Sequence, residues 1–157
     1  MSRWQEVINI ARQVRNNFHD DEQPLKETFE KICNSKNIEI IYAPCGEHAC
    51  QEANGGKIVL PLDTSRARDN FTVAHELGHI YLNHQPDGNG VFRRSGKSTQ
   101  EEIEANLFAA EFLMPKDKFT EAAKKFDFDE NSLANEFEVS KTAALVRMSA
   151  LKLRPQS

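Results

Sequence analysis

The chain has 157 residues, of which 39% are hydrophobic and 28% are charged, and its formal net charge is -4 at pH 7. This length allows one compact domain with a buried core, and the composition is that of a globular protein. The negative net charge argues against a protein built mainly to coat nucleic acid.

The sequence carries no signal for export or for a membrane segment. No stretch approaches the ~18 apolar residues that a membrane helix needs, and the N-terminus lacks an apolar signal-peptide core. We therefore expect a cytoplasmic protein without membrane contact. Its three cysteines, Cys33, Cys45 and Cys50, are expected to be reduced thiols. The Cys45 to Cys50 spacing is too unspecific to predict a second metal site, so a surface loop is favoured there.

Two helices are predicted at the start of the chain. Apolar residues recur at three- and four-residue steps between Trp4 and Phe18, which is the stripe of an amphipathic helix. A second helix is predicted to begin near Pro24, a favourable first-turn residue. Its expected buried side chains are Leu25, Phe29 and Ile32.

Two strands are predicted next, at 38–42 and 57–60. The first is rich in β-branched and aromatic residues, and the second ends at Pro61, which has no N–H to donate to a ladder. The second strand is a candidate sheet edge, beside which an extended substrate can add as a further strand. An ordinary interior strand is an equally weighted alternative.

A helical pattern follows from Ser65 to Asn83, and a loop rich in Gly, Asp, Asn and Arg is predicted at 84–97. The run from Ser98 to Glu101 matches a capping box, in which the serine hydroxyl and the glutamate carboxylate accept hydrogen bonds from amides at a helix start. A nearly continuous apolar run to Met114 then predicts a largely buried helix.

Three short helices are predicted after Pro115, at 118–126, 130–137 and 141–151, the last of them capped by Ser140. We therefore expect a core over residues 1–115 and a helical, helix-turn-helix-like appendage over 116–157. Lys141 and Arg147 are positioned to meet phosphates there. The appendage, however, has eight Lys and Arg against seven Asp and Glu. Packing or partner recognition is therefore favoured over DNA contact.

The segment His75-Glu76-Leu77-Gly78-His79 is an HExxH pattern. At about 100° per residue, both imidazoles lie on one helix face and can share a metal ion. Glu76 lies near enough to that face to hold a metal-bound water as a base without ligating the metal. Because five residues can arise by chance, two ordinary surface histidines are the alternative.

A third ligand would strengthen the prediction of a metal site, since catalytic zinc usually takes three protein groups. His84 would point roughly 160° away from the metal face on a continued helix, so we interpret it as a helix-end histidine. The buried helix beyond Ser98 offers a better candidate. Glu104 and Glu111 fall on one side of it, which we expect to be the solvent face.

Glu102 falls on the opposite side of that helix, together with Asn106. A carboxylate directed into an apolar interior is costly without a cation, so we predict Glu102 as the third metal ligand. Asn106 is placed one turn further on, where it can orient a ligand histidine through its second ring nitrogen. A glutamate and an asparagine facing a wet cleft without metal remain the alternative.

Two blocks of the sequence resemble the ImmA/IrrE family of zinc metallopeptidases. They are Phe71-Thr72-Val73-Ala74-His75-Glu76-Leu77-Gly78-His79 and Glu102-Ile103-Glu104-Ala105-Asn106-Leu107-Phe108-Ala109-Ala110-Glu111-Phe112-Leu113-Met114-Pro115. The resemblance implies an α+β fold, with a minimal gluzincin-like (zincin) core in which a small sheet packs on helices. It implies Zn²⁺ bound by His75, His79 and Glu102, with Glu76 as the catalytic glutamate.

The resemblance also implies a role in gene regulation. Such proteins typically accompany a helix-turn-helix repressor in mobile elements or stress responses, and they relieve repression by cleaving it, as anti-repressors. An arginine often precedes the Phe-Thr pair in this family, where this chain has Asn70, with Arg66 and Arg68 close by.

Hydrolysis also needs a group that stabilises the oxyanion, and Tyr42, His48, Arg93 and Arg94 are the candidates. A site of two histidines and one carboxylate can hold iron or manganese as well as zinc. The alternative function is a zinc-containing regulatory or toxin-antitoxin-type module that binds a repressor or DNA without constitutive proteolysis. The presence of Glu76 favours the protease, because a structural zinc site has no use for a base.

Overall fold

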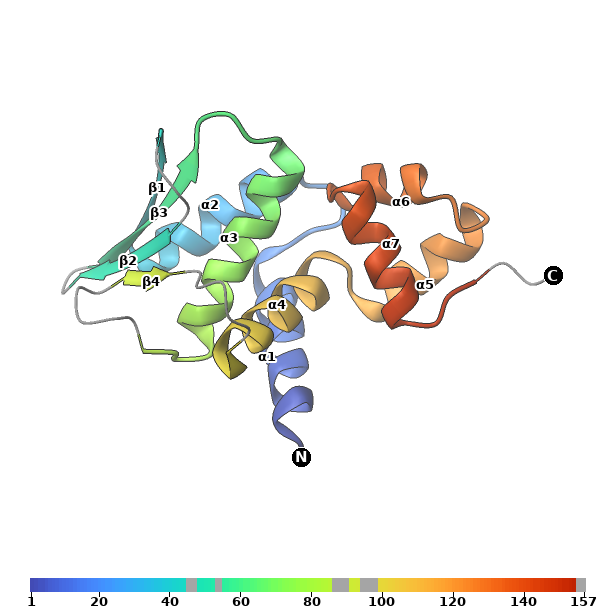
Figure 1. Ribbon diagram of the computed structural model, residues 1–157, viewed down its shortest axis with the longest axis horizontal. Coiled ribbons are helices and arrows are strands. Elements are labelled where there is room, and N and C mark those ends of the chain that lie inside the picture. The colour runs from blue at the N-terminus through green and yellow to red at the C-terminus, as the bar shows by residue number, and fades with distance from the viewer. Residues whose placement is uncertain (45–47, 53–54, 86–90, 94–98, 155–157) are drawn as a thin grey trace.

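The computed structural model describes residues 1–44, 48–52, 55–85, 91–93 and 99–154, and in this part of the chain seven helices and four strands form an α+β fold. In chain order they are α1 (Arg3–Phe18), α2 (Leu25–Lys36), β1 (Ile38–Ala43), β2 (His48–Glu52), β3 (Gly55–Pro61), α3 (Arg66–Tyr81), β4 (Val91–Arg93), α4 (Gln100–Leu113), α5 (Lys116–Lys125), α6 (Glu130–Phe137) and α7 (Lys141–Ala150). Figure 1 shows the sheet at one end of the molecule and α5, α6 and α7 grouped at the other.

The four strands form one sheet in the order β1-β3-β2-β4. β1 is parallel to β3, whereas β2 is antiparallel to both β3 and β4. Of the two alternatives for β3, the interior strand is therefore confirmed and the edge strand is wrong. No strand was predicted at β2, which pairs with the second side of β3. Pro61 ends β3, as predicted, at its pairing with Ala43.

The helix that follows the predicted capping box begins one residue later than expected. Thr99, not Ser98, is the N-cap of α4, and its hydroxyl accepts a hydrogen bond from the backbone N–H of Glu102 at 3.1 Å. Ser98 lies outside the described residues. Because Thr99 occupies the cap, Glu102 rather than Glu101 is the third residue of the helix.

A chain of aromatic rings joins three helices in the core. The ring of Tyr81 on α3 stacks on Phe108 of α4 at a centroid distance of 6.1 Å, and Phe108 stacks on Phe112 at 6.1 Å. Phe112 in turn stacks on Phe29 of α2 at 5.7 Å. These rings join α4 to α2 and α3, while the most extensive packing of α4 is against α3 and α1.

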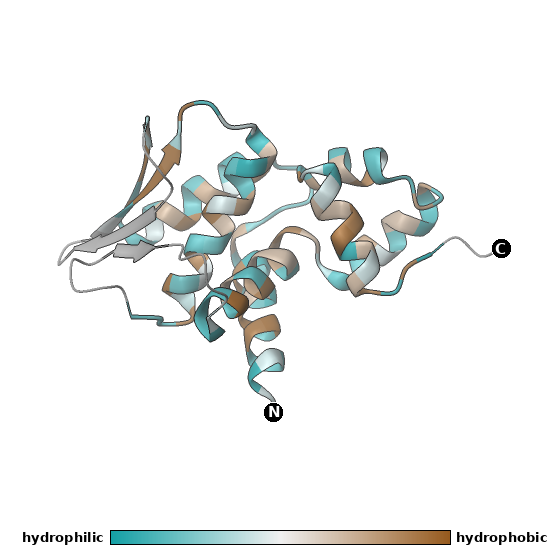
Figure 2. Cartoon of the chain, viewed as in Figure 1, coloured by the Kyte–Doolittle hydropathy of each residue, from teal (hydrophilic) through white to brown (hydrophobic). Residues whose placement is uncertain are grey.

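Polar and apolar residues are mixed along every helix (Figure 2). Large side chains that are fully buried include Ile32, Ile58, Leu60, Leu77, Phe108, Phe112, Leu113, Phe119 and Leu133. Among the described residues, none of the helices is long and apolar enough to cross a membrane.

Glu111 does not face solvent, so its prediction as a solvent-face residue is wrong. Its side chain is buried, and its carboxylate forms ion pairs with Arg12 of α1, at 2.7 Å, and with Arg147 of α7. The Nε of Arg147 also donates to the carbonyl of Met114 at 3.0 Å. A helical projection assigns a carboxylate to the solvent-exposed face. Here arginines from distant helices neutralise the buried carboxylate and offset the cost of its desolvation.

The connection between α6 and α7 is anchored to the core. Glu138 adopts the left-handed conformation, with φ 56°. Its carboxylate accepts from the N–H of Leu25 at 3.0 Å, and its carbonyl accepts from the side chain of Asn70 at 2.8 Å. Arg147 is buried in its pairing with Glu111, so the interpretation of this residue as a phosphate contact is wrong.

The partly buried histidine that caps the end of α1 is expected to make stability depend on pH. His19 lies 2.6 Å from the hydroxyl of Thr28, and burial, then the charge of Arg15, lowers its pKa to about 4 from 6.5. As pH falls from about 6.5 to about 4, the unfolded chain binds a proton that the folded chain excludes. We expect the free energy of unfolding to fall over that window in the wild type and less steeply in His19→Gln, measured by urea titration at each pH. Equal pH dependence in the two proteins would contradict this.

Candidate metal centre

The HExxH segment lies in the second half of α3, as the sequence predicts. Ser65 caps this helix by accepting a hydrogen bond from the N–H of Arg68 at 3.2 Å. His75 and His79 stand one turn apart, with ring centroids separated by 4.9 Å, and both are buried. Glu76, between them in sequence, is 0% exposed.

Helix α4 approaches this part of α3 closely because residue 78 is a glycine. A Cβ built on Gly78 would lie 3.1 Å from the Cβ of Phe108 and 3.2 Å from both the Cα and the carbonyl oxygen of Ala105. Any larger residue would push the two helices apart. The Gly inside HExxH therefore determines how near Glu102 comes to the two histidines.

Glu102 faces both histidines from the first turn of α4. Its Oε2 lies 3.1 Å from the Nε2 of His75, and its Oε1 lies 3.0 Å from the Nε2 of His79. One ligand atom from each of the three side chains lies within 4.8 Å of the others. The Glu102 side chain is 16% exposed, so the group is accessible from one side.

These three groups fit a zinc ion by chemistry and by spacing. Two nitrogens and a carboxylate are a usual catalytic donor set, and the histidines present the same ring nitrogen, Nε2. Ligand atoms around a tetrahedral zinc ion are about 3.3 Å apart, close to the separations of each nitrogen from Glu102. The predicted ligands are thus brought together within reach of one metal ion.

Asn106 lies where the sequence analysis expects it. Its Oδ1 is 2.8 Å from the Nδ1 of His75, on the opposite side of the ring from Glu102. An amide oxygen can only accept, so the Nδ1 of His75 carries a proton, and in the neutral ring the Nε2 can present its lone pair to a metal ion. This is the tautomer that a metal ligand requires.

His84 does not point away from the site, so that prediction is wrong. Its Nδ1 lies 2.8 Å from the Nδ1 of His79, and its side chain is buried. The reason is the end of α3. Asn83 is left-handed, with φ 58°, and the N–H of His84 binds the carbonyl of His79 at 3.0 Å. This Schellman-type turn folds the chain back instead of continuing the helix.

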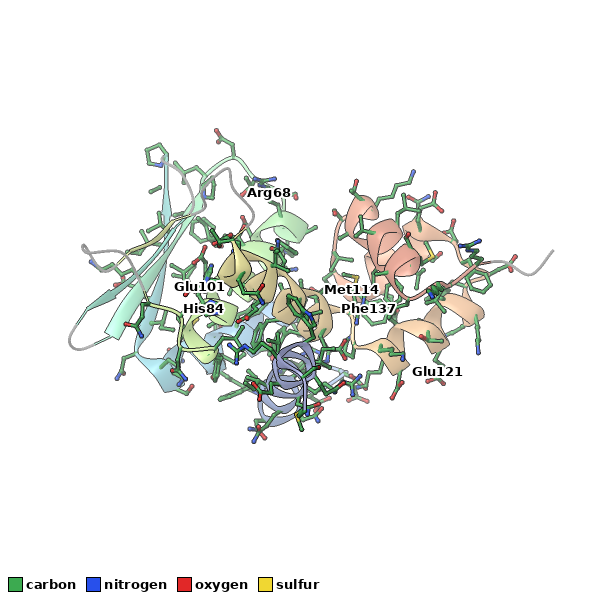
Figure 3. The ribbon with its side chains drawn as sticks, turned by 60° about the horizontal axis from the view of Figure 1, so that its bottom comes forward. Arg68, His84, Glu101, Met114, Glu121 and Phe137 are labelled. Atoms are coloured by element: carbon green, nitrogen blue, oxygen red, sulfur yellow. The ribbon has the colours of Figure 1, made fainter. Side chains whose placement is uncertain are left out.

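Glu104 is likewise not on a solvent face, which corrects the second half of that prediction. Its Oε1 accepts from Arg3 at 2.8 Å and lies 2.9 Å from the Nε2 of His84, while its Oε2 accepts from Gln100 at 3.0 Å. The Arg3 hydrogen bond, with that of His84, lowers the pKa of Glu104 to about 2 despite partial burial. Figure 3 shows His84 on the same side of the molecule as Glu101, near the start of α4.

Of the four candidates for oxyanion stabilisation, Tyr42 is the one whose side chain the structure describes. Tyr42 lines a cleft between α2, β1 and the first half of α3, and that lining includes none of the three clustered side chains. His48 and Arg93 are paired positions of β2 and β4. Arg94 and Cys45 lie outside the described residues. Asn70, where the family often has arginine, is buried and bonded to the carbonyl of Glu138.

A small sheet packed on helices, with HExxH on one helix and a glutamate facing it from the next, defines a zincin-like protein. The chain belongs to the IrrE N-terminal-like domain family, Peptidase M78, whose sequence model matches residues 33–149. Membership in this family indicates a metallopeptidase. The matched residues include the helix with HExxH and most of the C-terminal helices.

A solved structure described as a "Mycobacterium tuberculosis transcriptional regulator" is similar, with a TM-score of 0.61 and 14% sequence identity. The similarity covers 94% of this chain and 52% of that one, so this chain spans about half the length of the regulator. At this identity the similarity shows the fold. A comparison with curated proteins finds no match.

The close approach at Gly78 predicts the effect of one methyl group. In Gly78→Ala the gain in helix propensity, about 1 kcal/mol, opposes an overpacking cost of about 1–3 kcal/mol. We expect a net loss of stability of up to about 2 kcal/mol, and weaker Zn²⁺ binding because Glu102 is displaced from the histidines. Thermal unfolding and chelator competition measure the two effects. Unchanged zinc affinity would show that α4 is not positioned by this contact.

Proposed function

We propose that this chain is a zinc-dependent endopeptidase whose metal is held by His75, His79 and Glu102. The observation that carries the proposal is the convergence of these side chains from two helices within 4.8 Å. Asn106 supports it, because accepting a hydrogen bond from the Nδ1 of His75 favours the neutral tautomer whose Nε2 can bind a metal. The assigned family of peptidases supports the same chemistry.

In this proposal Glu76 is the general base. When bound, zinc polarises the substrate carbonyl and lowers the pKa of a water molecule. The Glu76 carboxylate accepts a proton from the attacking water and delivers it to the amine nitrogen that leaves. Glu76 follows His75 on α3, is fully buried, and does not belong to the group of three ligands.

We propose that the substrate is a cytoplasmic helix-turn-helix repressor encoded near this gene, cut in a flexible segment. Membership in the family and the fold of a chain described as a transcriptional regulator both support a regulatory role. A scissile segment must reach the partly exposed Glu102 between surrounding helices, and an unfolded linker can do this more readily than a folded domain.

We further propose that residues 1–115 are the catalytic core and that 116–157 recognise the protein partner. α6 and α7 pack on each other, and α7 presents exposed Leu145 and Val146, 45% and 63% accessible. An apolar exposed face suits a protein partner better than phosphates. The burial of Arg147 against Glu111 argues in the same direction.

The proposed base gives a direct test. In Glu76→Gln we expect Zn²⁺ content to equal that of the wild type, because the three ligands remain, and cleavage of the neighbouring repressor to fall by about 10²–10⁴-fold. Glu121→Gln is the matched control, an exposed glutamate on α5 that lies far from His84 in Figure 3. Metal content by elemental analysis and cleavage by gel electrophoresis give the two readouts.

The outcomes separate the two candidate functions. Cutting by the wild type and by Glu121→Gln, with loss in Glu76→Gln and after chelation, supports the protease. Metal in all three proteins without cutting, together with repressor or DNA binding in gel shifts, would instead support the non-proteolytic regulatory module. Iron or manganese in place of zinc would revise the metal and leave the residue roles unchanged.

A further inference from the structure

A continuous series of polar contacts runs behind the metal centre, away from Glu102. The Nδ1 of His79 lies 2.8 Å from the Nδ1 of His84, and the Nε2 of His84 lies 2.9 Å from the Oε1 of Glu104. Arg3 and Gln100 donate to the two oxygens of Glu104 at 2.8 and 3.0 Å. The series thus begins at a proposed ligand and ends at a cation on α1.

Hydrogen-bond chemistry gives one consistent set of protons along this series when both histidines are neutral. The ionised carboxylate of Glu104 accepts hydrogen bonds from Arg3 and Gln100. A carboxylate can only accept, so the Nε2 of His84 donates to it and carries a proton. In neutral His84 the Nδ1 is then an acceptor. The short contact between the two Nδ1 atoms is satisfied when His79 donates. The Nε2 of His79, 3.0 Å from the Oε1 of Glu102, could then present its lone pair to a metal ion held between the two groups.

We propose that His84 and Glu104 are positioning residues that hold His79 in the ring orientation and tautomer needed to bind the metal. The inference rests on the proposed function, because it assumes that His79 is a metal ligand. It assigns this chain a carboxylate–histidine–histidine support that the sequence patterns did not predict. Arg3 acts one step further away, by orienting Glu104.

The two histidine ligands are supported unequally. His75 donates to the amide of Asn106, an exposed residue, whereas His79 donates to an imidazole backed by an ionised carboxylate, both buried. An acceptor backed by a charge makes the ligand ring more basic than a neutral amide does. Loss of the His84 support should therefore weaken metal binding even though all three ligands remain.

The same helix offers a matched control. Glu111 is two turns further along α4 than Glu104, equally buried, and also paired with an arginine of α1, Arg12. Its hydrogen bonds in the described part of the chain come from Arg12, from the N–H of Lys116 and from Arg147. Glu111→Gln therefore removes a comparable buried charge without touching the support of His79.

The test measures Zn²⁺ affinity by competition with a chromophoric chelator, and the visible spectrum of the Co²⁺-loaded proteins. His84→Phe keeps a ring but removes both hydrogen bonds, and we expect a 10–100-fold loss of Zn²⁺ affinity and an altered Co²⁺ spectrum. His84→Asn keeps an acceptor near the Nδ1 position and should recover part of the affinity. Glu104→Gln should cause a smaller loss than His84→Phe. Glu111→Gln should lower the melting temperature and leave the affinity and spectrum unchanged.

Circular dichroism identifies variants that fold, and if His84→Phe does not, His84→Asn and Glu104→Gln decide. Wild-type affinity and spectrum in the folded His84 and Glu104 variants would overturn the positioning roles and leave the proposed protease intact. An equal loss in Glu111→Gln would also overturn them, since the effect would then follow general stability. A wild-type protein that binds neither Zn²⁺ nor Co²⁺ would overturn the proposed function itself.

Discussion

The close contact between α3 and α4 is the constraint on which the site depends. Gly78 lies against the backbone of Ala105, so the two helices meet without a side chain between them. This contact places the first turn of α4 beside the second half of α3, and Glu102 then meets His75 and His79 at about hydrogen-bond distance. The ring stack of Tyr81 on Phe108 holds the same two helices together nearby.

The need to neutralise the carboxylates of α4 explains much of the remaining arrangement. Arg3 forms an ion pair with Glu104, and Arg12 forms one with Glu111, so two buried carboxylates of α4 bind α1. A second cation reaches Glu111 from α7. Such pairs contribute little net stability compared with apolar packing, but breaking one leaves a buried charge, at a cost of about 3–5 kcal/mol. They therefore specify which helices can lie against α4.

The sequence predicted the features that depend on residues close together in the chain. The start of α3 at Ser65, the end of β3 at Pro61 and the shared face of His75 and His79 depend on neighbouring residues, and the structure bears these out. The positions of Glu104 and Glu111 depend on arginines about a hundred residues away, which a helical projection cannot include. The turn that brings His84 back against His79 depends on the left-handed conformation of Asn83, whereas the prediction assumed a continued helix.

The pairing of Arg147 with Glu111 bears on how recognition and cleavage are combined. Glu111 and Glu102 are on one rigid helix, nine residues or about 14 Å apart at 1.5 Å per residue. The turn before α7 is also bound to α2 and α3 through Glu138. If the exposed face of α7 binds the substrate, these contacts hold that face at a fixed distance from the histidines. A partner is then cut where a flexible segment spans that distance, so geometry as well as side-chain preference would select the scissile bond.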